Sequence, residues 1–113
     1  MKRRRFTART DANQREIVTI ARRCGAVVVD LHALPDVGAD LLVGHRGRWA
    51  LWEVKDGRLP TSRRRLTSNE KRMMTICETR GLAYWIIENA GDVHVQLGSS
   101  FRPIFASTTE GTP

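Results

Sequence analysis

The segment that decides the fold is Ala39-Asp40-Leu41-Leu42-Val43-Gly44-His45-Arg46-Gly47-Arg48-Trp49-Ala50-Leu51-Trp52-Glu53-Val54-Lys55. Two apolar runs flank Arg46-Gly47, and a short connection of this kind predicts a β-hairpin. With His45 paired to Arg48, the register places Asp40 directly opposite Glu53. Two carboxylates are therefore expected to meet across one face of a sheet.

The residues around these two acids predict a metal site. Side chains alternate along a strand, so Glu53 and Lys55 share one face while Val54 points to the other. Opposed carboxylates repel each other unless a cation lies between them, and oxygen ligands favour Mg²⁺ or Mn²⁺ over softer metals. The pattern indicates metal-assisted phosphodiester cleavage. The alternative is a surface ladder of salt bridges on an exposed hairpin.

Composition limits the chain to one small domain with excess positive charge. Its 113 residues include 19 Lys and Arg against 12 Asp and Glu, a net charge of +7, and 41% are hydrophobic, enough for one modest core. The basic residues cluster, which favours a polyanion as partner; alternatively, they only keep the protein soluble. The lack of a long apolar stretch predicts a soluble, cytoplasmic protein without membrane contact.

Cysteine and histidine residues give no sign of a further site. Cys24 and Cys77 are isolated, so neither a disulfide framework nor a zinc site is expected, and both are predicted to be reduced thiols at core positions. His32, His45 and His94 are scattered without helical pairing, and we expect them at surface or loop positions.

Helix signals occur on both sides of the hairpin segment. Residues 1–9 predict a flexible basic arm, followed by a helix that begins at Asp11 and ends near Gly25. A second helix is expected from Thr67, which forms a capping-box pattern with Glu70.

Strand signals complete an α/β domain over residues 10–98. Residues 26–31 predict a buried strand, residues 82–87 a strand buried on both faces, and residues 92–97 an alternating edge strand. The tail of residues 99–113 is predicted to be loosely packed. The expected order is helix, three strands, helix, strand, strand, with a mixed sheet flanked by helices.

The order of elements and the spacing of Asp40, Glu53 and Lys55 resemble the PD-(D/E)XK nuclease superfamily, and look most similar to phage and archaeal Holliday-junction resolvases and the VRR-NUC group. The resemblance covers roughly residues 10 to 90. It implies a restriction-endonuclease-like core and a Mg²⁺-dependent DNA endonuclease. It also adds Glu16, since many members carry a further acid in the first helix, so the implied catalytic set is Glu16, Asp40, Glu53 and Lys55.

Three positions qualify the match. Ala39 occupies a place where relatives often have Pro. The literal Pro-Asp pair ends at Asp36, which the hairpin register puts beyond the end of the strand, so Asp40 is assigned to the motif while Asp36 could assist from the loop. Glu70 stands where relatives often carry Gln, and it either joins the site or only caps the second helix.

The resemblance also implies how these groups would act. Asp40, Glu53 and the backbone carbonyl of Val54 would hold Mg²⁺, with Mn²⁺ as a substitute, and Glu16 would bind through a water or help to hold a second ion. Lys55 would orient the attacking water or offset charge on the pentacovalent phosphate. Cleavage would leave a 5′-phosphate.

The expected partner is DNA, which the protein would bind through the phosphates without recognising the base sequence. Branched DNA would require a homodimer, because one chain offers one site, and Trp85, Val93 and Val95 are candidate dimer surfaces or else ordinary core. The residues predicted to bind DNA are Arg3, Arg4, Arg5, Arg63, Arg64, Arg65 and Lys71.

The leading hypothesis is a structure-selective endonuclease of phage or prophage origin that acts in DNA recombination or repair. The first alternative is a less selective phage nuclease for DNA degradation or packaging. The second is a DNA-binding accessory protein that has lost activity.

Overall fold

A computed structural model of the chain describes the backbone of residues 2–98 and the side chains of residues 12–98, so the predicted tail lies outside the described residues. The elements in chain order are α1 (Lys2–Arg23), β1 (Val27–Asp30), a 3-10 turn η1 (Pro35–Val37), β2 (Leu41–His45), β3 (Arg48–Val54), a 3-10 turn η2 (Thr61–Arg63), α2 (Ser68–Arg80), β4 (Ala83–Ile87) and α3 (Ala90–Leu97).

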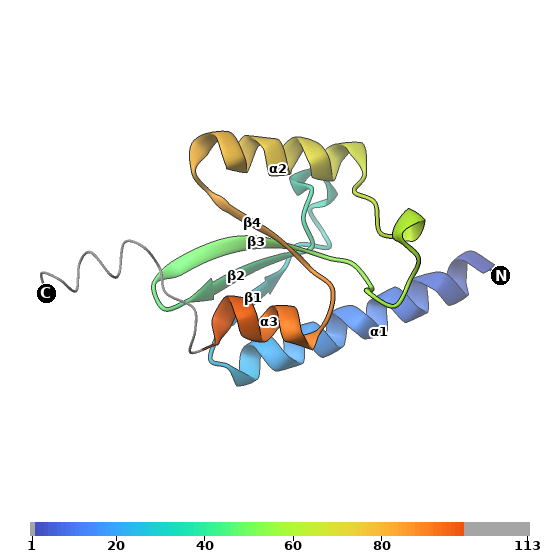
Figure 1. The fold of residues 1–113 in the computed structure, drawn as a ribbon, viewed down its shortest axis with the longest axis horizontal. Coiled ribbons are helices and arrows are strands. Elements are labelled where there is room, and N and C mark those ends of the chain that lie inside the picture. The colour runs from blue at the N-terminus through green and yellow to red at the C-terminus, as the bar shows by residue number, and fades with distance from the viewer. Residues whose placement is uncertain (1, 99–113) are drawn as a thin grey trace, which may run out of the picture.

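The strands form one mixed sheet in the order β1-β2-β3-β4. The first three strands are antiparallel neighbours, and β4 runs parallel to β3. Helix α2 lies on one face of the sheet, and α1 and α3 lie together on the other (Figure 1). The predicted α/β fold with a mixed sheet flanked by helices is confirmed.

The β2–β3 hairpin turns where the sequence predicts. His45 pairs with Arg48, and both turn residues have positive φ, 53° at Arg46 and 80° at Gly47, as a two-residue type I′ connection requires. The ladder ends at Leu41 and Trp52, one pair earlier than expected. Beyond this pair the Asp40 amide donates to the carbonyl of Trp52 (3.0 Å), and the Asp40 carbonyl accepts from the Leu31 amide (2.9 Å).

The hydrophobic core lies between the sheet and the two helices α1 and α3. Ile17 and Ala21 form the buried stripe of α1, one helical turn apart. They pack with the residues of the sheet that point to this face and with the buried side of α3: Val28, Leu41, Val43, Trp52, Val54, Ile87, Val93 and Leu97.

The start of the first helix differs from the prediction. Helix α1 extends from Lys2, not from Asp11, so the backbone of the predicted arm from residue 2 onward is helical. Residues 2–23 contain no Gly or Pro, which would end a helix. The helix therefore continues through Asp11, and the capping pattern there does not mark its start. The side chains of residues 2–11 lie outside the described part of the structure.

The predicted edge strand at residues 92–97 is wrong, since this segment belongs to helix α3. The Asn89 side chain accepts a hydrogen bond from the Asp92 amide (2.9 Å) and caps the helix. Val93 and Leu97 are buried one helical turn apart, whereas Val95 is 61% exposed. Apolar residues at positions 93 and 97 fit the two-residue period of a strand as well as the 3.6-residue period of a helix. The Asn89 cap favours the helix.

The strand at residues 82–87 is present as β4, but it is not buried on both faces as predicted. Trp85 and Ile86 are 40% and 39% exposed on opposite faces of the strand. Within the described residues β4 pairs only with β3. It is therefore an edge strand, and its two faces are less covered than those of a central strand.

The strand predicted at residues 26–31 is present as β1, but it is not buried as predicted, since Val27 and Val29 are 57% and 42% exposed. His45 is half-buried within β2, not at the surface or loop position that was expected.

Other local predictions agree with the structure. Gly25 and Gly81 have positive φ at the ends of α1 and α2, and the capping box of Thr67 and Glu70 is formed. Both cysteines are free thiols; Cys77 is buried and Cys24 half-buried. None of the helices among the described residues is long and apolar enough to cross a membrane.

Alanine substitution at two valines tests the helical assignment of residues 90–97. Val93→Ala removes two methyl groups from the core and is expected to lower the free energy of unfolding by about 2 kcal/mol. Val95→Ala should change it by less than about 0.5 kcal/mol. Urea unfolding measures both. Equal losses would contradict the helix, because a strand would place both residues on one face.

Candidate active site

The loop that carries Asp40 is fixed against α2 and β4. Gly38 has φ of 80°, and a Cβ there would lie 2.7 Å from the backbone oxygen of Asn69, so only glycine lets the loop approach α2 this closely. The Tyr84 hydroxyl donates a hydrogen bond to the Gly38 carbonyl (2.6 Å), and the side-chain amide of Asn69 donates to the carbonyl of Pro35 (3.0 Å). Asp40 is thereby held next to the end of β3.

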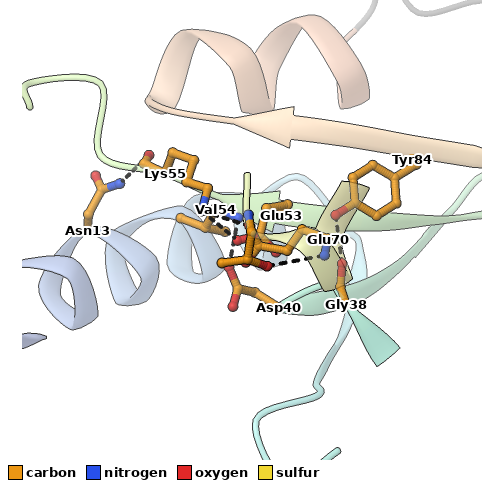
Figure 2. A network of polar contacts seen from close by, with 9 residues as sticks. Asn13, Gly38, Asp40, Glu53, Val54, Lys55, Glu70 and Tyr84 are labelled. Carbon is orange, nitrogen blue, oxygen red and sulfur yellow. Dashed lines mark hydrogen bonds and ion pairs between the residues drawn. The ribbon is translucent and has the colours of Figure 1, made fainter. Parts of the chain in front are cut away.

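The structure brings Asp40 and Glu53 together, although they are not paired in the ladder (Figure 2). The Asp40 carboxylate accepts a hydrogen bond from the Val54 amide (2.8 Å) and interacts with the Glu53 side chain. Glu53 is only 3% exposed. The two predicted acids therefore meet at the end of the hairpin, with Glu53 buried and Asp40 half-buried.

Lys55 lies between two carboxylates from different elements. Its Nζ is 3.3 Å from Glu53 Oε2 and 3.0 Å from Glu70 Oε1, the latter at the start of α2 (Figure 2). Its backbone carbonyl accepts from the Asn13 side chain on α1 (3.0 Å), and its amide donates to Ile87 O (3.0 Å). Contacts with α1, α2 and β4 thus fix both its backbone and its ammonium group.

Glu70 caps its helix, as one of the two alternatives predicted, and its carboxylate also contacts Lys55 in the cluster. Its Oε1 accepts from the Thr67 amide (2.8 Å) as well as from Lys55 Nζ (3.0 Å). The capping-box pattern identified the first contact. The second depends on how α2 folds back over β3, which no local pattern encodes.

Glu53 carries the proton of this cluster at neutral pH. Burial, followed by the charges of Asp40 and Glu70, raises the pKa of Glu53 to about 9, and the nearby ammonium of Lys55 does not offset these effects. Although Lys55 Nζ lies within ion-pair distance of Glu53, the main ionic partner of Lys55 is therefore Glu70.

Burial and the neighbouring charges also shift the pKa values of Asp40, Glu70 and Lys55. Burial raises the pKa of Asp40, against the hydrogen bonds from Val54 and Glu53. Burial also favours the neutral form of Glu70, but hydrogen bonds from Glu53, the Thr67 amide and Lys55 outweigh it and lower the pKa of Glu70. For Lys55, the two glutamates outweigh desolvation and raise its pKa.

Asp40, Glu53 and Lys55 line a cleft of about 760 Å³ beside α1. Three arginines from two elements border it, Arg15 and Arg22 on α1 and Arg63 in η2. Asp56, which is 2% exposed and pairs with Arg58 (2.9 Å), also lines the cleft. The cleft therefore combines acidic groups near the strand end with cationic side chains around them.

Glu16 is not brought to this group. It is exposed on α1 and does not line the cleft, where Gln14 and Arg15 stand instead. Asp36 is exposed in η1. Among the described residues, no group of three or more His, Cys, Asp or Glu side chains is arranged to hold a metal ion. The metal donors that meet here are Asp40 and Glu53.

The residues predicted to contact DNA fall into different settings. Arg63 borders the cleft, while Arg65 and Lys71 are exposed. Arg64 forms an ion pair with Glu88 (2.9 Å) and so has a partner within the domain. The side chains of Arg3, Arg4 and Arg5 lie outside the described residues.

Two residues of the site were missed by sequence reasoning. Asn13 is 6% exposed in the middle of a polar helical stretch, and Asp56 follows directly on Lys55. The position of Asn13 four residues before buried Ile17 was an available signal for Asn13.

Comparisons of the chain with protein-family models, with curated proteins and with solved structures gave no match.

Replacing Glu53 by Gln is expected to stabilise the protein increasingly as the pH rises. Because the folded pKa of about 9 exceeds the ordinary 4.5, the contribution of the protonated carboxyl is fully present below about pH 4.5 and is lost as the pH rises through about 9. The melting temperature of Glu53→Gln in EDTA should exceed that of the wild type by a margin that grows from about pH 5 to about pH 9.

Glu78→Gln, at an exposed position of α2, is the matched control and should show a margin that does not change with pH. A pH-independent margin for Glu53→Gln as well would contradict a buried, protonated Glu53.

Proposed function

We propose that this protein is a Mg²⁺-dependent DNA endonuclease of the PD-(D/E)XK type. The observation that carries the proposal is the contact of half-buried Asp40 with buried Glu53, with Lys55 beside them, in a cleft bordered by arginines. A binding surface for a polyanion gains nothing from two carboxylates, whereas a metal centre requires them.

The element order supports the same proposal. A helix, three antiparallel strands, a second helix and a strand parallel to the third follow each other here as in the restriction-endonuclease-like core. The departures are Ala39 in place of Pro and the exposed position of Glu16.

The donor chemistry of the site fits Mg²⁺. This ion binds proteins through one or two carboxylates and keeps several waters, and Asp40 and Glu53 supply two carboxylates. In an extended strand the carbonyl of a residue points to the same edge as its amide, and the Val54 amide donates to Asp40, so the Val54 carbonyl would serve as the third oxygen. When bound, Mg²⁺ would polarise the scissile phosphate and acidify a water.

The side chains of the chain have separate tasks in this mechanism. Glu53 would have to lose its proton before both acids could act as ligands. The Lys55 ammonium, held by Glu70, would orient the attacking water or offset the charge that develops on the phosphate. Arg15, Arg22 and Arg63 would position the DNA backbone.

Branched DNA, such as a Holliday junction, is the substrate we propose, with a role in recombination or repair and an origin in a phage or prophage. The cationic groups at the cleft carry no base-reading geometry of their own, so selectivity would arise from DNA shape. Symmetric cutting of a junction would require two copies of the chain.

An inactive DNA-binding accessory protein is the second candidate. It is favoured by the separation of Glu16 from the acidic pair and by the proton on Glu53, since both leave the site with few charged ligands. Cleavage assays distinguish the two candidates.

The test uses labelled four-way junction, flap, linear duplex and single-stranded DNA, each with Mg²⁺ or with EDTA. The wild type should cut the junction or flap in Mg²⁺ only. Asp40→Asn and Lys55→Ala should each lower the rate by about 100-fold or more, because each removes a group that acts on the reacting phosphate.

Asp36→Asn is the matched control, since it changes the acid of the literal Pro-Asp pair, and should cut like the wild type. Equal cutting of all four substrates would contradict selectivity for branches. No cutting of any substrate would favour the accessory protein.

Mg²⁺ binding is expected to release a proton at neutral pH, because Glu53 is protonated below its pKa of about 9. Titration calorimetry in two buffers of different ionisation enthalpy measures the number of protons released. The apparent affinity for Mg²⁺ should rise with pH up to about 9. Glu53→Gln should bind weakly and release none, whereas proton-independent binding by the wild type would place the ion elsewhere.

A further inference from the structure

The loop that follows Lys55 holds an ion pair outside the acidic cluster. Asp56 is only 2% exposed, and its carboxylate accepts hydrogen bonds from the Arg58 amide (2.9 Å), from Arg58 Nε (2.9 Å) and from Arg58 Nη2 (3.0 Å). The Arg58 side chain is nevertheless 69% exposed. One buried carboxylate therefore fixes both the backbone and the guanidinium group of an arginine that faces solvent.

The contact between Arg58 and Asp56 uses only one edge of the guanidinium group. Such a group has five N–H donors, and Asp56 takes two of them, one on Nε and one on Nη2. The other two-donor edge, formed by Nη1 and Nη2, makes no hydrogen bond within residues 12–98. Arg58 therefore keeps an edge with which it can bind a second anion.

This arrangement prepares Arg58 for an anion with two oxygens. A long exposed side chain loses rotamer freedom when it binds, and a guanidinium group that is already held in place loses less. Arginine commonly binds phosphate groups through two parallel N–H donors, and the edge formed by Nη1 and Nη2 has this geometry. The contact with Asp56 thus places a preorganised phosphate-binding edge at the surface.

Arg58 lies at the rim of the cleft. Asp56 and Leu59, on either side of it in the sequence, both line the cleft. Hydrogen bonds with Asp56 raise the pKa of Arg58, and the negative charge of Glu16 on α1 adds to this effect. The guanidinium group therefore lies between the loop and α1, the two elements that border this side of the cleft.

The charges around Arg58 favour an anion in spite of the two acids. Arg15 on α1 and Arg63 in η2 line the same cleft, so three guanidinium groups stand against Glu16 and Asp56. The carboxylate of Asp56 is already neutralised by its contact with Arg58. The excess charge is positive, as it is for the chain as a whole.

We propose that Arg58 binds a backbone phosphate of the DNA next to the phosphate that is cut, and that Asp56 is its positioning residue. This inference rests on the proposed function, because it takes DNA as the ligand. Lys55 and Arg58 are three residues apart, so at most about 11 Å separates their Cα atoms. The bound phosphate therefore belongs to the same stretch of strand as the phosphate on which Lys55 acts.

The alternative role of Arg58 is only to neutralise Asp56. Loss of Arg58 would then weaken DNA binding solely because the uncompensated carboxylate repels phosphate. It would have no effect once Asp56 is replaced by Asn, since no charge is left to compensate. A double variant therefore separates the two roles.

The test is binding of a labelled four-way junction by the full chain in EDTA, which prevents metal-dependent cutting, at several KCl concentrations. Arg58→Gln should weaken binding by about 10-fold and reduce the slope of log K against log salt by about 0.9, because one phosphate contact is lost. Asp56→Asn combined with Arg58→Gln should bind about 10-fold more weakly than Asp56→Asn alone.

Arg80→Gln is the matched control. It removes the same charge at an exposed position at the end of α2, on the other face of the sheet, and should bind like the wild type. Circular dichroism and thermal unfolding show whether each variant is folded.

Equal binding by Asp56→Asn with and without Arg58→Gln would overturn the proposal and leave the proposed function intact. Equal losses in Arg58→Gln and Arg80→Gln would overturn it as well, since they would indicate an effect of net charge alone. A wild type that binds no junction would overturn the proposed function together with this contact.

Discussion

The ion pair between Lys55 and Glu70 is the interaction on which the site depends. It connects the end of β3 to the first turn of α2, and it places one positive charge among three carboxyl groups. Removing one partner of this half-buried ion pair would leave the charge of the other uncompensated. The same ammonium that stabilises the fold therefore also sets the charge that the cleft offers to a ligand.

Three carboxyl groups near one lysine leave an excess of negative charge, and the protein balances it with a proton. Glu53 holds that proton because it is the most deeply buried of the three. A bound cation would compete with the proton for the same oxygens. Occupation of the site by a cation would in this way be linked to pH, and the proton allows the fold to accommodate the acidic pair.

The sequence predicted the hairpin, the caps of α2 and the meeting of Asp40 with Glu53, because turn geometry, capping and alternation are local properties. It failed at Val93, where one set of apolar positions fits both a strand and a helix, and at Lys2, where no signal marks the true helix start. It could not place Asn13 beside Lys55, since their contact depends on how α1 packs against the sheet.

The hairpin that turns at Arg46 and Gly47 can change in length only in certain steps, because side chains alternate between the two faces of each strand. Inserting one residue into β3 would move Glu53 to the face occupied by Val54, among Ile17 and other core side chains, and would turn Val54 toward the cleft. Insertions in pairs would keep every side chain on its own face. Related chains that retain the acidic pair should therefore differ in hairpin length by even numbers of residues.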